Sequence, residues 1–333
     1  MALTAYGDIS PRTAAYAAAE MLKRAQPYLI LQQFGQAKPI PANSSQTVKF
    51  RRYNALDPAI TPLTEGVTPT GSSLTHSDVS ATLSQFGDFV ELSDVIADTH
   101  EDPVFKETQS IIGEQAAQTV ETVLYNILKA GTNVYYSVGT SRAEVNAEYT
   151  LNMQRKMTRS LKRQNARYIT SKVSSTTKFN TENVAPAFVG FIHPDMESTI
   201  RGLAGFIDVK DYGSMTPYEF EIGAVEDVRY IRSTIIDPWA DAGALLDGAG
   251  YDTISTSGTN SDVYPVLLTA ADSYATTPLK GGNAMTPMVL NPNTPREGDP
   301  MGQRGYVSWK TYFTGCILND AWFVRGEVAV REL

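Results

Sequence analysis

Cysteine and histidine are scarce in this chain of 333 residues, which limits the chemistry it can perform. The single cysteine, Cys316, excludes an internal disulfide framework and any zinc site made from several cysteines. No apolar stretch reaches the roughly 18 residues that a membrane-spanning helix requires, so no membrane span is expected. The opening residues, MALTAYGDISPR, lack a basic segment followed by an apolar one, so we expect no secretory signal.

Charged residues are also few, at 19% of the chain, where about 25% is usual for a soluble protein. We therefore expect much of the surface to meet other protein rather than water. The 36 acidic residues outnumber the 28 basic ones and give a net charge of −8, which argues against a dedicated nucleic-acid reader. Hydrophobic residues make up 42%, enough for a globular protein, and the length allows about two domains.

The charge is unevenly distributed along the chain. Residues 142–178 carry nine basic and two acidic residues, a net charge of +7, whereas residues 87–121 carry nine acidic residues and one lysine, a net charge of −8. Blocks of opposite sign can dock on each other, within one chain or between chains. Two separately solvated faces are the alternative, and the sequence leaves both open.

Residues 150–165 are predicted to form a basic helix inside the positive block. Four of its basic residues lie three or four positions apart and share one face: Arg155, Arg159, Lys162 and Arg163. Such a stripe could track phosphates without reading bases. Aromatic residues are nearly absent from it, so base stacking is not expected. We favour contact with an acidic protein surface over contact with DNA.

The pattern of apolar residues predicts a mixed α+β fold. Alternation at 48–53 and at 79–92 predicts two strands joined by a Pro/Gly-rich tip into a long hairpin, which is expected to lie on another part of the protein. Apolar spacings of three and four predict a helix of about 42 Å over 103–130. Other expected elements are helices at 14–25, 150–165 and 194–203, strands at 187–193, 221–234 and 264–269, two or three strands within 305–330, and loops at 241–262 and 281–302.

No catalytic signature is present: the phosphate-binding loop, the dinucleotide fingerprint, HExxH, CxxC and GxSxG are all missing. The best local cluster is His193, Asp195 and Glu197, which a hydrolase or a metal site could use. The structural interpretation is simpler, because His193 ends a predicted strand and the two acids fall in a first helical turn, where negative charge is favoured. We therefore expect no catalytic, metal or cofactor-binding residues, and an inert, buried Cys316.

Several segments, taken in order across nearly the whole chain, point to a family: LTAYGDISPRTAAYAAAEMLKRAQPYLIL, FGQAKPIP, VKFRRYNAL, TPLTEGVTPTG, QFGDFVELSDVIADTHEDPV, FVGFIHPDME and MGQRGYVSWKTYF. Together with the order of elements, they resemble the major capsid protein of tailed double-stranded DNA phages, which has the HK97-type fold. Within that class, these sequence segments are most similar to those of the N4-like phage family. No single segment is decisive, but the set is specific.

The resemblance implies how the chain is divided. It places an N-terminal arm at 1–47 and an extended E-loop hairpin at 48–100. A peripheral domain with the spine helix would comprise 101–140 and 303–333, and an α/β axial domain would comprise 141–302. Some relatives crosslink their shells through an E-loop lysine, but residues 53–105 contain no lysine, so that bond is not expected here.

The function that the resemblance implies is structural, without catalysis. The chain would assemble as hexamers and pentamers into an icosahedral head around double-stranded DNA, which it would contact non-specifically. A separate scaffolding protein and a portal are implied as partners, and a decoration protein is allowed. The protein would be part of the virion after assembly in the host bacterial cytoplasm, with no membrane contact. The alternatives are an encapsulin-like nanocompartment shell and, from another class, a hydrolase using His193.

Overall fold

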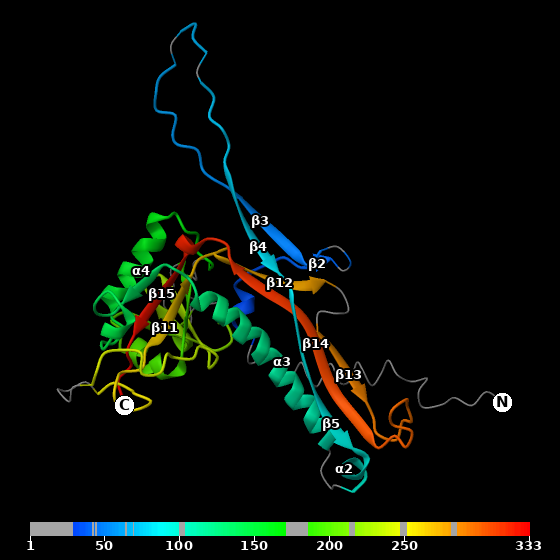
Figure 1. The fold of residues 1–333 in the computed structure, drawn as a ribbon. Helices are drawn as coiled ribbons and strands as arrows, with labels where there is room; N and C mark the ends of the chain where they lie inside the picture. The colour runs from blue at the N-terminus through cyan, green and yellow to red at the C-terminus, as the bar shows by residue number, and fades with distance from the viewer. Residues whose placement is uncertain are drawn as a thin grey trace.

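Two β-sheets joined by one long helix dominate this computed structural model, and a hairpin projects from them (Figure 1). The expected α+β class is therefore confirmed. The structure describes residues 29–41, 43, 45–63, 65–68, 70–99, 104–170, 186–212, 217–246, 252–280 and 285–333. The helix expected at 14–25 lies outside these residues.

The long helix, α3, spans Val104–Lys129, close to the predicted 103–130. Its 26 residues correspond to a length of about 39 Å. In its first half, Ile112 shares a core with Trp309 of one sheet, and in its second half Leu124 lies in the core of the other. α3 therefore crosses both sheets and links them, as Figure 1 shows.

The larger sheet has seven strands within the described chain, in the order β6-β15-β11-β7-β10-β9-β8. The helix α4 (Leu151–Arg163), which matches the predicted basic helix, packs on one face, and the second half of α3 packs on the other. The strands are β6 Val134–Tyr136, β7 Phe188–Ile192, β8 Phe206–Asp208, β9 Glu221–Val225, β10 Val228–Arg232, β11 Tyr264–Thr269 and β15 Phe323–Val328. The strands predicted at 187–193, 221–234 and 264–269 are confirmed.

β7 shows why the centre of this sheet reads as an uninterrupted apolar run. Successive side chains of a strand point to opposite faces. Phe188 and Ile192 enter the core shared with α4, whereas Val189 and Phe191 enter the core shared with α3. All four are fully buried, and each contributes about 1.5–3 kcal/mol of transfer free energy. A sheet covered on both faces leaves no solvent-facing position to be polar.

The second sheet is built around one long strand, β14 (Arg304–Ile317). β5 pairs antiparallel with it on one side, and β12 and β13 pair antiparallel with it as well. Two short strands that precede the hairpin add to β12 in parallel. The remaining members are β1 Gln36–Ala37, β2 Ile40–Pro41, β5 Ser84–Ser93, β12 Tyr274–Lys280 and β13 Met285–Leu290.

The projecting hairpin consists of β3 (Thr47–Tyr53) and β4 (His76–Thr82), paired antiparallel. The single strand predicted at 79–92 is wrong, because the chain leaves β4 at Leu83 and continues as β5 in the second sheet. Leu83 is buried, and its N–H donates to the carbonyl of Gln46 at 2.9 Å. Alternation continues through such a break, so the sequence pattern alone does not reveal it.

The pairing of strands cuts across the ranges of the expected division of the chain. β15 and β6 fall in the ranges assigned to a peripheral domain, yet both belong to the seven-stranded sheet. β12 and β13 fall in the range assigned to an axial domain, 141–302, yet both pair with β14. Sheet membership depends on hydrogen bonds between segments far apart in sequence, which a division into consecutive ranges cannot represent.

Smaller elements complete the description. The loop expected at 281–302 contains β13, which tolerates Pro287 because it is an edge strand. β12 and the short helix α2 (Asp94–Thr99) were not predicted. The helix expected at 194–203 is present as η5 and α5, and 305–330 contains two strands, as expected. The short helices are η3 Leu31–Gln33, η4 Arg142–Glu144, η5 Pro194–Met196, α5 Glu197–Arg201, η6 Val209–Asp211 and η7 Asp320–Trp322.

Candidate assembly surfaces and their anchoring contacts

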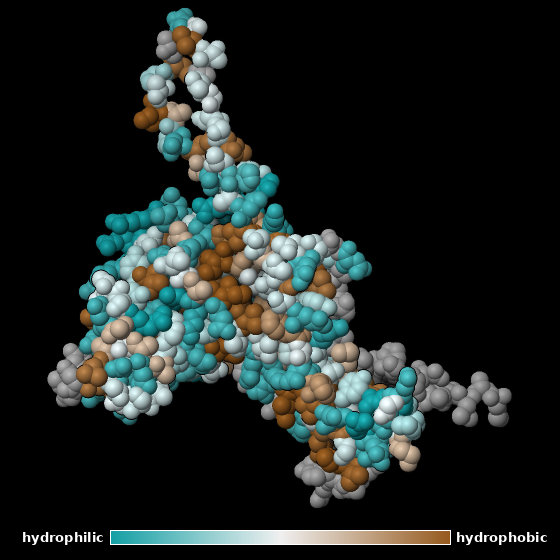
Figure 2. All heavy atoms as spheres, viewed as in Figure 1, coloured by the Kyte–Doolittle hydropathy of each residue, from teal (hydrophilic) through white to brown (hydrophobic). Residues whose placement is uncertain are grey.

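The tip of the projecting hairpin exposes apolar side chains to solvent. Residues 54–75 connect β3 to β4 without regular structure where they are described, and they reach well away from the body of the subunit (Figures 1 and 2). Five large hydrophobic residues there are between 56% and 87% exposed: Leu56, Ile60, Leu63, Val67 and Leu74. Such residues have no core of their own subunit to enter, so this segment is suited to contact with other protein.

The base of the hairpin is fixed to the body. Arg51 donates two hydrogen bonds to the carboxylate of Asp78 across the strand pair, at 2.8 and 2.9 Å, and this contact lowers the pKa of Asp78. Phe50 and Ala81 form a small core with Cys316 of β14. The expectation of a buried Cys316 is confirmed, and burial raises the pKa of its thiol to about 11, which disfavours the reactive thiolate.

A second group of exposed apolar residues lies at the far end of the second sheet. Phe89, Val95, Ile96 and Ile111 come from β5, α2 and α3 and are between 41% and 64% exposed. Figure 2 shows hydrophobic residues gathered at the end of the molecule where Figure 1 places α2 and β5. Two separate surfaces, the hairpin tip and this end, are therefore available for contact with other chains.

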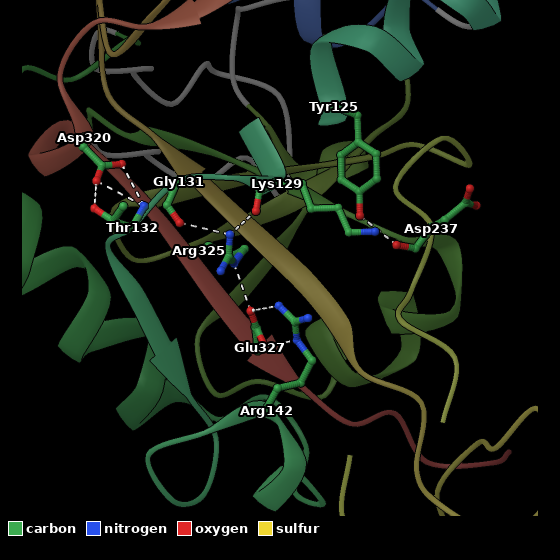
Figure 3. A network of polar contacts seen from close by, with 9 residues as sticks. All are labelled: Tyr125, Lys129, Gly131, Thr132, Arg142, Asp237, Asp320, Arg325 and Glu327. Atoms are coloured by element: carbon green, nitrogen blue, oxygen red, sulfur yellow. Dashed lines mark hydrogen bonds and ion pairs between the residues drawn. The ribbon is translucent and has the colours of Figure 1, made fainter. Parts of the chain in front are cut away.

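The C-terminal end of α3 is held by a buried polar network (Figure 3). The Arg325 guanidinium, on β15, donates to the carbonyl oxygens of Lys129 and Gly131, the second at 3.0 Å. A helix leaves its last carbonyl groups without internal partners, and positive charge is favoured there. Arg325 therefore caps α3 from a neighbouring strand.

Glu327 joins this cap to the chain that follows α3. It is fully buried and accepts hydrogen bonds from Arg325 at 2.9 Å and from Arg142 at 2.7 and 2.8 Å (Figure 3). The pKa of Arg142 is raised, chiefly by this contact. Asp320 accepts from the N–H of Thr132 at 3.1 Å, just after the helix. The network fixes where α3 ends relative to the larger sheet.

An aromatic ring lies beside the same network. The Arg142 guanidinium is 3.7 Å from the ring centre of Trp239, and the Lys129 ammonium is 4.5 Å from it. Burial, and then the nearby Arg142, lower the pKa of Lys129. The sequence analysis did not identify this cluster, although two charged residues, Arg325 and Glu327, within the range 305–330 that was predicted to form strands were a visible signal.

The four candidate residues of the basic helix fall into two classes. Arg155 donates to Glu226 at 2.9 Å, and Lys162 forms an ion pair with Asp227. Both acids lie in the tight turn between β9 and β10 of the same subunit, so these two cations hold that turn. The ion pair with Glu226 raises the pKa of Arg155, and that with Asp227 raises the pKa of Lys162.

The other two candidate residues of the basic helix, Arg159 and Arg163, lie at a surface pocket. Arg159 and Arg163 form no ion pair within the described part of the chain. Together with Lys156 they line a pocket of about 260 Å³, whose other lining residues are Tyr135, Ser160 and Gln164. The pocket offers hydrogen-bond donors and positive charge, so it suits a carboxylate or a phosphate.

Docking of the positive block on the negative block within one subunit is not observed among the described residues. The ion-pair partners of the positive block are acids elsewhere, such as Glu327 for Arg142 and Asp272 for Arg167. In the negative block, Asp88 and Glu107 are exposed, whereas Glu121 is buried. Contact between the two blocks of different subunits remains a proposal.

His193 makes local contacts at the end of β7, and its Nδ1 lies 3.1 Å from a carboxylate oxygen of Asp195. Its Nδ1 accepts the N–H of Asp195 at 3.3 Å, which caps the helical turn that follows β7. Asp195 accepts from the hydroxyl of Tyr264, and Glu197 is engaged by Arg201 and Arg232. Among the described residues, no group of three or more His, Cys, Asp or Glu side chains is arranged to hold a metal ion. The structural interpretation of this cluster is thus supported.

None of the helices within the described residues is long and apolar enough to cross a membrane.

Comparison with known proteins was made at the level of sequence families and of folds. A family model described as phage capsid protein matches residues 77–258. No curated protein sequence matches the chain. The matched range includes β5, α3, α4 and the strands of the larger sheet up to β10.

Solved structures resemble the whole chain. The capsid of Ralstonia phage GP4 has a TM-score of 0.64 at 12% identity, covering 90% of this chain and 88% of that one. The head structure of Helicobacter pylori bacteriophage KHP40 has a TM-score of 0.58 at 11% identity, covering 89% and 87%. An encapsulin complex from Synechococcus elongatus PCC 7942 is similar at a TM-score of 0.52 and 11% identity, covering 91% and 88%. At such identities the likeness is one of fold.

Proposed function

The chain belongs to the phage capsid protein family, and from this premise we propose that it assembles as hexamers and pentamers into an icosahedral head that encloses double-stranded DNA. Its role is structural rather than enzymatic: it is a major capsid protein, a component of the virion, with the HK97-type fold and a place in a multimeric lattice. The observation that carries the proposal is the family match over 77–258. Contacts that repeat from subunit to subunit and close into rings generate such shells.

Different parts of the subunit are proposed to have different roles in assembly. Residues 1–47 act as the N-terminal arm and 48–100 as the E-loop. The sheet pairing supports a revised division, in which the E-loop ends at Leu83. In this division β5, α3 and β12–β14 form the peripheral domain, and β6–β11 with β15 form the axial domain. The exposed apolar tip at 54–75 supports an intersubunit role for the E-loop.

We propose that the basic helix contacts an acidic surface of a neighbouring subunit. Arg155 and Lys162 are already paired within the subunit, so Arg159 and Arg163 carry this role, with Lys156 beside them. Exposed acids of the negative block, such as Asp88 and Glu107, offer matching charge. The alternative is that these cations contact the phosphates of packaged DNA. Complementary charge of this kind sets register and partner choice more than net affinity.

The remaining partners are proposed from family membership. They are a separate scaffolding protein, a portal and, where present, a decoration protein, with assembly in the host bacterial cytoplasm. Membership of the N4-like group stays a prediction. An encapsulin-like shell is disfavoured, because its likeness is one of fold only and the family match is to phage capsid protein.

Electron microscopy of the purified full-length chain tests the proposal. Closed icosahedral shells, alone or after addition of a scaffolding protein, are the expected result. Compact oligomers of fixed small size, with no shells under either condition, would contradict it. Shells that contain a dedicated protein cargo and no DNA in infected cells would favour the nanocompartment instead.

A further inference from the structure

Glu121 is a carboxyl group buried in an apolar core. It lies on α3 between Val120 and Leu124, and its side chain is 0% exposed. Acidic residues are almost never fully buried unless they are paired, because the charged form loses its hydration. A glutamate at this position therefore requires an explanation that packing does not supply.

Its partners are backbone groups of the segment that leads into the first strands. The Glu121 carboxylate accepts the N–H of Leu31 at 3.1 Å and the N–H of Gln32 at 3.3 Å. These are free N–H groups in the first turn of η3, where Ile30 supplies no side-chain cap. From the opposite side, the hydroxyl of Tyr274 on β12 donates to the carbonyl of Leu31. The turn is clamped between α3 and β12.

Within the part of the chain that the structure describes, no lysine, arginine or histidine forms an ion pair with Glu121, and η3 contributes no charged side chain. Tyr274 is the one ionisable group that interacts with it from the elements packed around it, and the pKa of that hydroxyl is itself raised well above 10 by burial. Burial opposes the charged carboxylate and raises the pKa of Glu121 to about 8, although hydrogen bonds from the backbone N–H groups of Gln32, Leu31 and Ile30 favour the charged form.

We propose that Glu121 is a proton-operated latch that holds the root of the N-terminal arm, the turn 31–33, against the long helix. With the carboxyl neutral, the turn is seated in the apolar core. With the carboxyl ionised, the cost of burying an unbalanced charge favours an open arrangement in which the turn leaves and water reaches the side chain. The arm and the helix are thereby coupled through one titrating group.

The direction of the pH dependence follows from the two pKa values. In the seated state the pKa of Glu121 is about 8, and in the open state it falls towards the ordinary 4.5. The seated state binds the extra proton, so seating is strongest below pH 4.5 and is weakened as pH rises through 8. Between these values, one proton is linked to opening, so the opening equilibrium changes by up to about tenfold per pH unit.

Hydrogen exchange in the full-length chain tests this latch without reference to assembly. The protection factors of the Leu31 and Gln32 amides, corrected for the intrinsic pH dependence of exchange, are measured from pH 5.5 to 8.5. We expect protection to fall by at least about tenfold in total over this interval. Glu121→Gln, which cannot ionise, should show protection that does not change with pH. A carboxyl ¹³C titration of Glu121 should give a midpoint near 8.

Tyr274→Phe is the matched control, because it removes the other hydrogen bond to the same turn without removing the carboxyl group. It should lower protection by a similar factor at every pH and keep the wild-type slope. The proposal is overturned if wild-type protection is independent of pH, or if Glu121→Gln retains the wild-type slope. Neither result would bear on shell formation, so this test is distinct from that of the proposed function.

Discussion

Arg325 and Glu327 show how much this subunit depends on charges that it buries. Glu327 is fully buried and Arg325 is 7% exposed, and together they hold the carbonyl end of α3 against β15. Arg142 completes the pairing from the segment after α3. Removing one member of such a set leaves another charge buried without its partner, which costs far more than losing an exposed ion pair.

Glu327→Gln should therefore destabilise the subunit by about 3–5 kcal/mol, measured as the free energy of unfolding in urea. The two guanidinium groups of Arg142 and Arg325 would then face each other without a negative charge between them. Arg331→Met is the control, because Arg331 pairs with Glu148 at 3.1 Å on the surface and should cost only about 0–1 kcal/mol. Equal effects of the two changes would show that the buried network does not hold the fold.

His193→Ala should change little. The variant loses one hydrogen bond from the N–H of Asp195, worth about 1 kcal/mol of folding free energy, together with the contacts of the ring with Tyr264 and the Asp195 carboxylate. Assembly and the thermal stability of shells should be close to those of the wild type in electron microscopy and calorimetry. Discovery of a hydrolytic or metal-dependent activity that the variant lacks would overturn the structural interpretation of this residue.

At the scale of the element, α4 serves two purposes with one run of basic residues. One pair of cations, Arg155 and Lys162, secures the turn between β9 and β10. Arg159 and Arg163 line a pocket on the surface. Two variants with the same change in charge can therefore separate folding from assembly.

Arg159→Glu with Arg163→Glu should leave folding intact and impair the formation of empty shells, because these cations form no ion pair with any residue that the structure describes. Arg155→Glu with Lys162→Glu should instead lower the melting temperature, since Glu226 and Asp227 would then face like charges. Shell yield by electron microscopy and melting by circular dichroism are the two readouts. Normal empty shells from the first variant, with reduced packaged DNA, would show that this face meets phosphate rather than protein.

At the scale of the whole molecule, the subunit combines a self-sufficient body with extensions that contact little of it. The body has cores on both faces of the larger sheet and between α3 and β14. The hairpin beyond β3 and β4 has exposed apolar side chains and no comparable core. A subunit built in this way can fold without its neighbours and still has apolar surface on the hairpin to bury on assembly.

Deleting 58–72 should leave the melting temperature of the unassembled subunit almost unchanged, because these residues add little to its cores. Assembly should fail, since the apolar tip would no longer reach a neighbour. Replacing Ile60, Leu63 and Val67 with serine is the matched control, because it keeps the length of the loop and removes its apolar surface. If the deleted protein still forms normal shells, the loop has no intersubunit role.

Much of this fold was predictable because local patterns are strong where one element covers another. α3, α4, β7 and β11 were predicted nearly at their observed bounds, since their apolar periodicity follows directly from the faces they bury. The break at Leu83 and the strand β13 were not predicted. Both depend on pairing with β14, which is remote in sequence from β5 but is the next strand after β13.

The candidate site likewise combines features that the sequence predicted with features that depend on the tertiary structure. Periodicity placed Arg155, Arg159, Lys162 and Arg163 on one face of a helix, but the partners of two of them lie in a turn about 65–71 residues away. Glu121 appeared as one more acid in a negative block, and only the approach of residues 31 and 32 buried it. Neither effect is visible from the sequence spacing of charges.

Residue type and periodicity were enough to exclude internal disulfides and to predict the long helix and the buried strands, and the quoted segments carried the resemblance to phage capsid proteins. The tertiary structure decided which strands share a sheet, which cations stay free for a neighbour, and which carboxyl groups lose their water. Those outcomes depend on hydrogen-bond pairing and burial between distant segments, and the physical reason is that solvation and electrostatic energy are set by three-dimensional surroundings rather than by chain neighbours.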